Sequence, residues 1–263
     1  MNDATLRLAI FLGLLALLIA AEYMVPQRAR ALPRTSRWRT NISVAFLNVV
    51  TLWIMGALLP VMAVGAALDA GAHGFGLLNH LSLPYAVEFM IALIALDFSI
   101  WAQHLITHKI PLLWRLHRVH HADRDMDVTT AVRFHPVEIA LSMALKIGLI
   151  YALGPAALAV LTFEALLNGL AMFNHANIKL PPRVDAILRL FIVTPDMHLV
   201  HHSTDRAEHD SNYGFGLSIW DRLFGTYTAR PRNGVRDMRI GLHWQDDRPS
   251  RLKWVLGLPF HKK

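Results

Sequence analysis

The sequence predicts an all-α membrane protein in which transmembrane helices form the base and a cytoplasmic cap of helices carries clustered histidines. Composition is the first indication: 54% of the 263 residues are hydrophobic and only 17% are charged, with a mean hydropathy of +0.35. That is too apolar for an ordinary soluble domain. The second indication is a series of apolar runs that reach the length needed to cross a bilayer. The third is the clustering of histidines beside these runs.

Charge and cysteine content exclude several classes of site. The net charge is +7, and a basic chain can bind nucleic acid. Here most cations flank apolar segments, as in the cytoplasmic loops of membrane proteins, so we expect no nucleic-acid partner. The sequence contains no cysteine. This excludes disulfides and thiolate-held zinc, haem and iron–sulfur sites within these residues, and it leaves imidazole as the expected metal ligand.

The first two apolar segments are residues 6–25 and 42–68. The first is long enough to span a membrane. A signal peptide is the alternative, but Glu22 does not fit the small-residue pattern of a cleavage site. Between the two segments, residues 26–40 carry five arginines and no acid, so the positive-inside rule places this stretch in the cytoplasm. Pro60 interrupts the second segment, which is therefore either one kinked span or a span plus a short interfacial piece.

The third predicted span, residues 84–106, returns the chain to the cytoplasmic side and contains Asp97, which is costly in lipid. Asp97 shares a helical face with His104 and His108. It could accept the second N–H of a metal-bound imidazole, the usual arrangement around a metal ligand. It could equally be an interhelical hydrogen-bond partner with no metal role.

Histidines recur at spacings that place them on shared helical faces. One H-x3-H pair and two H-x2-H-H triplets are joined by a single histidine between the triplets. One H-x3-H pair is a weak signal, but this combination is hard to reach by chance. Nine imidazoles exceed the four ligands of a structural zinc, so we predict two metal ions. Imidazole binds Fe, Zn, Cu and Ni alike, so the ligand type does not identify the metal. The candidates are His104, His108, His117, His120, His121, His175, His198, His201 and His202.

Both triplets can join one site only if an even number of membrane crossings separates them. Residues 137–173 are apolar for longer than one span requires, and Gly154-Pro155 near the middle is a turn signal. Two short helices, 137–153 and 156–173, would supply two crossings. We therefore predict that the last two transmembrane helices form a hairpin.

The order H-x3-H, H-x2-H-H, H-x2-H-H on a polytopic, cysteine-free chain resembles the fatty acid hydroxylase/sterol desaturase superfamily of membrane di-iron oxygenases. The resemblance covers roughly residues 22–260. Asn-His-Ala-Asn at 174–177 and Trp-Asp-Arg-Leu-Phe-Gly-Thr at 220–226 resemble the bacterial branch, which is related to alkylglycerol monooxygenase and sterol C-5 desaturase. The resemblance implies about four transmembrane helices and a cytosolic helical cap. No linker is evident, so residues 1–263 are expected to form a single integral-membrane domain, with its catalytic histidine region at about 97–226.

The same resemblance, applied residue by residue, implies that the nine histidines are the metal ligands; no other catalytic residue is indicated. Some members have a further histidine four residues from the position of His175, but this chain has Ala171 and Lys179 there. His135 lies in an R-x-H-P-x-E stretch typical of the family and is expected to be structural or to support a ligand. Besides water, the candidates for a tenth ligand are Asn174, Asn177 and His209.

The activity implied by the resemblance is oxidation of an alkyl C–H bond in a lipid or sterol-like substrate that enters from the bilayer. Two Fe2+ ions, for which zinc could substitute in a structure, would use O2 and two external electrons. Hydroxylation and desaturation share these motifs, so both stay open. No haem-binding or cysteine-rich segment is present. A separate electron donor is therefore expected, such as a ferredoxin, cytochrome b5, a reductase or a reduced pterin.

Three further interpretations concern the cations and the metal. The basic residues Lys109, Arg115, Arg118 and Arg124 could dock an acidic electron carrier or simply form a solvated cytoplasmic loop. A histidine-rich membrane protein that stores or transports metal would carry histidines along its spans, whereas here they cluster at one predicted face. A membrane zinc hydrolase would act without oxygen, and its HExxH and HxxEH motifs are absent.

Overall fold

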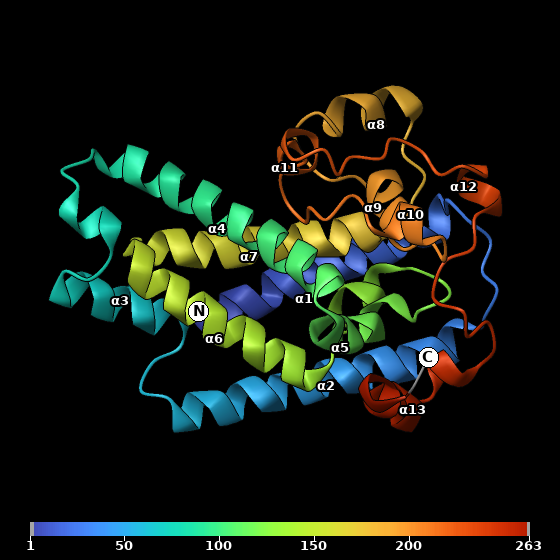
Figure 1. Ribbon diagram of the computed structural model, residues 1–263, viewed down its shortest axis with the longest axis horizontal. Coiled ribbons are helices and arrows are strands. Elements are labelled where there is room, and N and C mark those ends of the chain that lie inside the picture. The colour runs from blue at the N-terminus through green and yellow to red at the C-terminus, as the bar shows by residue number, and fades with distance from the viewer. Residues whose placement is uncertain (1–2, 262–263) are drawn as a thin grey trace.

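The structure is a computed structural model that describes residues 3–261, with the backbone alone described for 3–7 and 236. Within these residues every regular element is a helix, apart from isolated β-bridges, so the all-α prediction is confirmed. Long helices lie side by side along the long axis, and short helices gather at one end (Figure 1). The long helices are α1 (Asp3–Met24), α2 (Arg34–Leu58), α4 (Tyr85–Lys109), α6 (Pro136–Leu153) and α7 (Ala157–His175).

Four stretches of the described chain are long and apolar enough to cross a membrane. They are α4, α6, α7 and the region 34–80, which contains α2 and a separate short helix, α3 (Ala63–His73). α1 contributes a shorter apolar helix over Leu8–Met24. The prediction of about four transmembrane helices therefore agrees with the structure.

The break between α2 and α3 follows from Pro60, which has no backbone N–H to continue a helix. Of the two interpretations of segment 42–68, a span plus a short piece is the one that forms. α3 packs against α6 and α7 through buried alanines such as Ala66 and Ala70, whose small side chains let helix backbones approach closely.

The predicted hairpin of α6 and α7 turns at Gly154, which adopts a positive φ of 65°. Gly76, with φ of 93°, meets this turn so closely that a Cβ on it would lie 2.2 Å from the Gly154 backbone nitrogen. Only glycine satisfies both the backbone angle and the close approach. The hairpin returns the end of α7 to the end of the molecule where α6 begins (Figure 1).

The cap forms at that end from short helices and the loops between them (Figure 1). Its α-helices are α5 (Pro111–His121), α8 (Pro182–Leu188), α9 (Pro195–His201), α10 (Arg206–His209), α11 (Ile219–Leu223), α12 (Gly234–Asp237) and α13 (Leu252–Gly257). Its 3-10 helices are η2 (Val128–Val132), η3 (Arg248–Ser250) and η4 (Leu258–Phe260), whereas η1 (Leu77–His80) lies at the far end, before α4.

Arg37, from the arginine-rich segment 26–40, is fully buried and joins α2 to the cap. Its guanidinium donates to both carboxylate oxygens of Asp123 and to Asp127, each at 2.7 Å. Burial alone would raise the pKa of Asp123, but the Arg37 and Arg133 cations outweigh it and lower this pKa to about 2. The arginine interpreted as a topological signal is therefore also a structural residue, and its partner Asp123 lies two residues after the first histidine triplet.

Candidate metal centre

The structure brings all nine predicted histidines together in two adjacent groups beneath the cap. Every one is buried, with at most 5% of its surface exposed. Within each group, one ring nitrogen from each histidine lies within 4.8 Å of the others. The first group is His104, His108, His117, His121 and His201. The second group is His120, His175, His198 and His202.

Each triplet contributes to both groups because neighbouring positions on a helix point in different directions. On α5, His121 joins the first group and His120 the second; on α9 and the residue after it, His201 joins the first and His202 the second. The groups abut, since the rings of His121 and His202 stack with centroids 4.6 Å apart. The last two turns of α4, with His104 and His108, complete the first group, and the end of α7, with His175, completes the second.

Three of the rings are oriented by backbone carbonyls. His104, His175 and His201 each direct Nδ1 to a carbonyl oxygen at 2.6 to 2.7 Å. Because a carbonyl can only accept a hydrogen bond, Nδ1 carries the proton, and in the neutral ring Nε2 keeps a lone pair. The acceptors are, in the same order, the carbonyls of Tyr213, Ala171 and Ser211.

His117 is held by a carboxylate instead, and this geometry tests whether a metal ion fits the first group. Its Nδ1 donates to Glu138 Oε1 at 2.6 Å, and its Nε2 lies 3.0 Å from the Nε2 of His104. Both Nε2 atoms therefore present lone pairs to each other, an arrangement that repels unless a cation lies between them. Metal–imidazole bonds of about 2.0–2.1 Å fit within such separations.

The ring nitrogens of the second group lie equally close together. His175 Nε2 lies 3.0 Å from His120 Nε2 and 3.1 Å from His198 Nε2. Across both groups, buried ring nitrogens of the described chain lack any hydrogen-bond partner, among them both nitrogens of His108 and of His202. An unsatisfied buried polar atom is costly, and a metal ion would satisfy these nitrogens. The donor set thus fits two metal ions with imidazole ligands.

Burial keeps the cap histidines in the neutral form that binds metal. Loss of water around each ring, and then the neighbouring imidazoles, lower its pKa well below the ordinary value of 6.5. This applies to His120, His121, His198, His201 and His202.

Glu138, rather than Asp97, is the carboxylate that accepts a hydrogen bond from one of the nine histidines. It lies buried in the first turn of α6, where its Oε1 accepts the hydrogen bond from His117 Nδ1. Asp97 instead accepts hydrogen bonds from Trp220 Nε1 at 2.7 Å and the Leu217 backbone N–H at 3.1 Å. These contacts match the alternative interpretation, a carboxylate that joins helices. An acid at the start of a strongly apolar helix, three residues after His135, was the available signal for Glu138.

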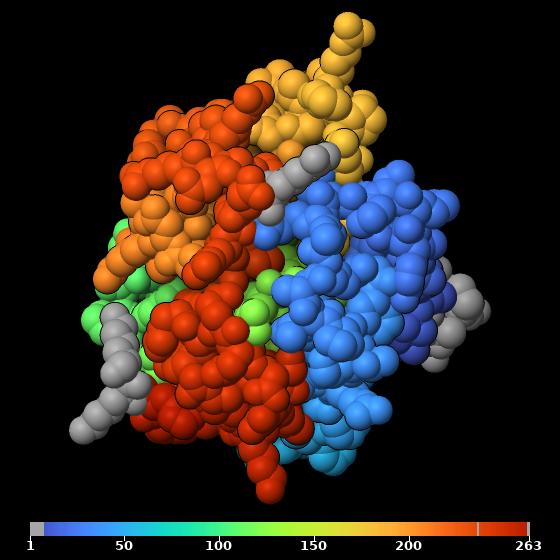
Figure 2. Space-filling model, turned by 90° about the vertical axis from the view of Figure 1, so that its right-hand side faces the viewer, coloured from blue at the N-terminus to red at the C-terminus, as the bar shows by residue number. Residues whose placement is uncertain are grey.

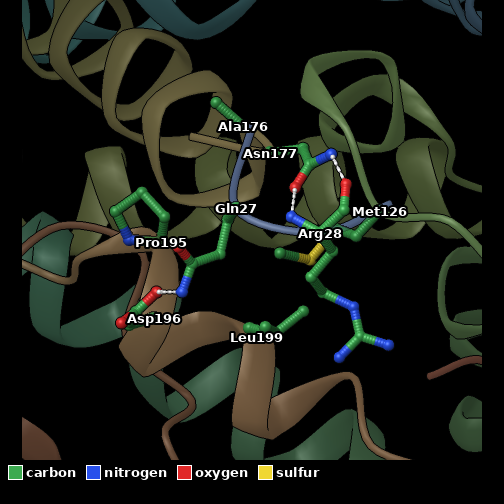
Figure 3. A pocket seen from close by; sticks show the side chains of 8 residues that line it. All are labelled: Gln27, Arg28, Met126, Ala176, Asn177, Pro195, Asp196 and Leu199. Atoms are coloured by element: carbon green, nitrogen blue, oxygen red, sulfur yellow. Dashed lines mark hydrogen bonds between the residues drawn. The ribbon is translucent and has the colours of Figure 1, made fainter. Parts of the chain in front are cut away.

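His135 and Asn177, two of the additional candidate residues, hydrogen-bond to backbone atoms elsewhere in the fold. His135 caps the start of α6, since its Nδ1 accepts the Val137 N–H at 3.2 Å, and its Nε2 lies 3.3 Å from the Leu256 carbonyl oxygen. Asn177 exchanges two hydrogen bonds of 3.0 Å with the Arg28 backbone (Figure 3). Neither contact involves one of the nine histidines.

The other two candidates for a tenth ligand lie nearer the groups. Asn174 is fully buried and donates to the Phe215 carbonyl at 3.0 Å, while its Oδ1 has no partner in the described chain. His209 stacks on Trp114 at 5.3 Å and lies beside His108, on the side of the first group. It forms a third set with His108 and Asp210. The further histidine of some family members pairs with the position of His175, which is in the second group. Of these two candidates, Asn174 is the one next to His175 in sequence.

Residues 25–28 form a strap that ties the ends of α7 and α9 together (Figure 3). Gln27 Nε2 donates to Asp196 Oδ1 at 3.0 Å, in the first turn of α9, while Arg28 pairs with Asn177 just after α7. The recess beside these residues has room for about one water molecule. Because α7 carries His175 and α9 carries His198, the strap helps to position two histidines of the second group.

The basic residues considered as a docking patch are bonded within the chain. Lys109 pairs with Asp210 at 3.0 Å. The other three donate to backbone carbonyls of the C-terminal region, while Lys109 and Arg115 stay exposed. The pairs are Arg115 with Pro259, Arg118 with Leu258 and His261, and Arg124 with Asp246.

Comparison with known proteins adds an independent finding. Residues 89–226 match the model of the fatty acid hydroxylase family. The chain is 31% identical over 157 residues to the ornithine lipid hydroxylase OlsE of Rhizobium tropici, covering 60% of this chain and 46% of that protein. It is 31% identical over 138 residues to human alkylglycerol monooxygenase, covering 52% and 30%. It is 28% identical over 147 residues to a cholesterol 25-hydroxylase-like protein of Danio rerio, covering 53% and 55%.

These matches are partial. The aligned part spans less than half the length of the ornithine lipid hydroxylase and of the alkylglycerol monooxygenase. No solved structure matches the chain.

Proposed function

We propose, from the membership of this chain in the fatty acid hydroxylase family, that it is a membrane-bound di-iron oxygenase that hydroxylates an alkyl C–H bond of a lipid. One observation carries the proposal: nine buried imidazoles converge in two adjacent groups, and in the first group the Nε2 atoms of His104 and His117 face each other with lone pairs, because both rings donate from Nδ1. The relatives named as lipid hydroxylases and monooxygenases support the reaction class. Desaturation of the same kind of substrate is the alternative outcome.

Each group would hold one iron ion, the first with five histidines and the second with four. The bound ions would supply the activation of O2, with two electrons from a separate donor. The protein's own part is orientation: backbone carbonyls fix the tautomers of three ligand rings, and Glu138 fixes that of His117. Such partners hold ligands in place and make them better donors. Asn174 or water would complete the second group.

Aromatic side chains shield the groups from water. The Phe134 ring stacks on His120 with centroids 4.5 Å apart, and the Phe215 ring packs 4.7 Å from His104. An apolar shell limits solvent access and lowers the local dielectric constant, which protects reactive species from side reactions. The substrate chain would enter from the bilayer between the spanning helices, which carry exposed apolar residues such as Ile94, Leu145 and Leu166.

Two alternatives receive less support. A metal store or transporter is expected to carry histidines along its spans, whereas the nine grouped histidines lie at the cap end of the long helices. A zinc hydrolase lacks motif support, since neither HExxH nor HxxEH occurs in the sequence. The cytoplasmic location of the cap rests on the positive-inside rule.

Lipid profiling of cells with and without the active protein is the experiment that tests the proposal. The His120→Ala variant serves as the inactive control, because it removes a ligand of the second group. We expect a lipid that gains one oxygen atom only with the wild-type chain, and we expect purified protein to form it only with iron, O2 and a reductant. Turnover that proceeds without oxygen would reject the oxygenase.

A further inference from the structure

A cavity of about 270 Å³ opens on the cap beside the first histidine group. α5, the segment around α10 and residues 242–244 form its walls, and His108 lies at its inner end. In Figure 2 the green, orange and red segments that line it meet at the left-hand edge of the molecule. Residues 242–244 lie outside the part that matches the family model, 89–226.

Arg118 supplies a fixed donor in this cavity. Its side chain is buried, with 3% exposed, and its Nη2 is anchored on the carbonyls of Leu258 and His261. Its Nε has no hydrogen-bond partner in the described chain. A buried donor left unpaired is costly, and a guanidinium already held in place loses little freedom when it binds a ligand.

Arg206 faces the same space from α10. Its side chain is 73% exposed and lies 3.6 Å from Asp210, which is longer than a hydrogen bond. Asp210 is the carboxylate that lines the cavity, and Lys109 already pairs with it at 3.0 Å. The cavity lining thus contains two arginines and one carboxylate, and because Lys109 pairs with that carboxylate, the excess charge of the cavity is positive.

Aromatic rings form the remaining walls. Trp114, with His209 stacked on it, lies in one wall, and Trp244, with the Arg118 guanidinium 5.6 Å from its ring centre, lies in another. Planar guanidinium groups bind phosphate and carboxylate through paired hydrogen bonds. The volume is near the lower limit of small-molecule pockets, which suits a compact anionic group rather than a whole lipid chain.

We propose that this cavity is a binding site for a phosphate or carboxylate group, held between Arg118 and Arg206. A lipid headgroup and a small soluble anion share this chemistry and are the two sources to be distinguished. The site rests on the arginines and not on the proposed oxygenase activity. Within that activity, it would hold the anionic head of a lipid or of a soluble co-substrate next to the first metal group.

The test uses metal-loaded, full-length protein in nanodiscs. In one arm the nanodiscs contain only zwitterionic lipid, and inorganic phosphate is titrated by calorimetry. In the other arm a phosphatidic acid is added, and native mass spectrometry counts the molecules retained by the protein. The test variant is Arg206→Gln, and the matched control is Arg251→Gln, which removes an exposed arginine that forms a similar i,i+4 pair with Asp247 outside the cavity.

We expect Arg206→Gln to weaken binding by at least about tenfold, the effect of losing one charge-assisted hydrogen bond, and Arg251→Gln to bind as the wild type does. Binding of phosphate with this pattern identifies a soluble anion; retention of phosphatidic acid alone, with the same pattern, identifies a lipid headgroup. Equal binding by the two variants, no binding of either probe, or binding that depends on the metal and not on Arg206 overturns the proposal. No outcome requires turnover, so failure of the oxygenase is detected separately.

Discussion

The Nε2 atoms of His104 and His117 lie 3.0 Å apart, although both rings already donate a proton from Nδ1 to another acceptor. A neutral imidazole carries one proton, so neither ring has a hydrogen to place between these atoms. A positive ion resolves the conflict, and a second protonation would need a charged ring in a buried site. The hydrogen bonds that fix the Nδ1 protons therefore leave both Nε2 atoms free to bind a metal ion.

Replacement of Glu138 tests this relationship. We expect Glu138→Ala to lower metal affinity by about 10–100-fold, because the carboxylate fixes the tautomer and orientation of His117. Glu138→Gln should lose less, since its amide oxygen can still accept the Nδ1–H. Competition with a chromogenic chelator measures the affinity. If both variants bind metal as tightly as the wild type, the carboxylate has no part in holding the ligand.

Asp97→Asn is expected to behave differently. Its carboxylate binds Trp220 and the Leu217 backbone rather than a histidine, so the variant should unfold at a lower temperature while it keeps its full metal content. Elemental analysis and thermal unfolding of the same preparation measure the two properties. Loss of metal from a protein that is otherwise stable would restore the supporting role that was first considered for Asp97.

His201 and His202 are adjacent in sequence but belong to different groups. We therefore expect His201→Ala and His202→Ala each to abolish turnover, and each to reduce the metal content from about two ions per chain to about one. His73→Ala, which changes an exposed histidine at the far end of the molecule, is the control. Metal analysis on purified protein is the measurement. An unchanged metal content in either variant would remove that residue from the ligand set.

The histidine groups were largely predictable because ligand spacing on a helix is a local property: residues three or four apart share a face. The hairpin at Gly154 followed from counting membrane crossings. The division of ligands between the groups was not predictable, since whether His120 joins His175 or His104 depends on how α5 packs against α4 and α7. Sequence analysis also missed ion pairs between residues far apart in the chain.

Arg37 and Asp123, for example, are 86 residues apart, and no local pattern marks one as the partner of the other. Arg37→Met should destabilise the protein by about 3–5 kcal/mol, because it leaves the Asp123 and Asp127 carboxylates buried without their cation. Arg39→Met changes an exposed arginine two residues away, and it should alter stability by less than about 0.5 kcal/mol. Denaturant unfolding in detergent measures both. Similar stabilities for the two variants would show that the buried pair contributes little.

The same pair predicts a pH dependence. The pKa of Asp123 is about 2 in the folded protein and about 3.9 in an unfolded chain. A lowered pKa stabilises the fold above the unfolded value, so this contribution is complete above about pH 5 and disappears as the pH falls through 4 toward 2. The difference between wild type and Asp123→Asn should therefore be constant from pH 5 to 8 and should shrink in acid. A difference that grows as the pH falls would contradict this assignment.

The orientation of the cap can be tested with cysteine labelling, because the sequence contains no cysteine to interfere. Arg39 and Lys253 are exposed in the cap region, whereas Ala72 is exposed in α3 at the opposite end of the long helices. If the arginine-rich segment is cytoplasmic, a membrane-impermeant thiol reagent should label Ala72→Cys in intact cells, and it should label Arg39→Cys and Lys253→Cys only after the membrane is opened. The reverse pattern would place the cap outside the cytoplasm. Labelling of all three in intact cells would contradict a chain that crosses the membrane through α2.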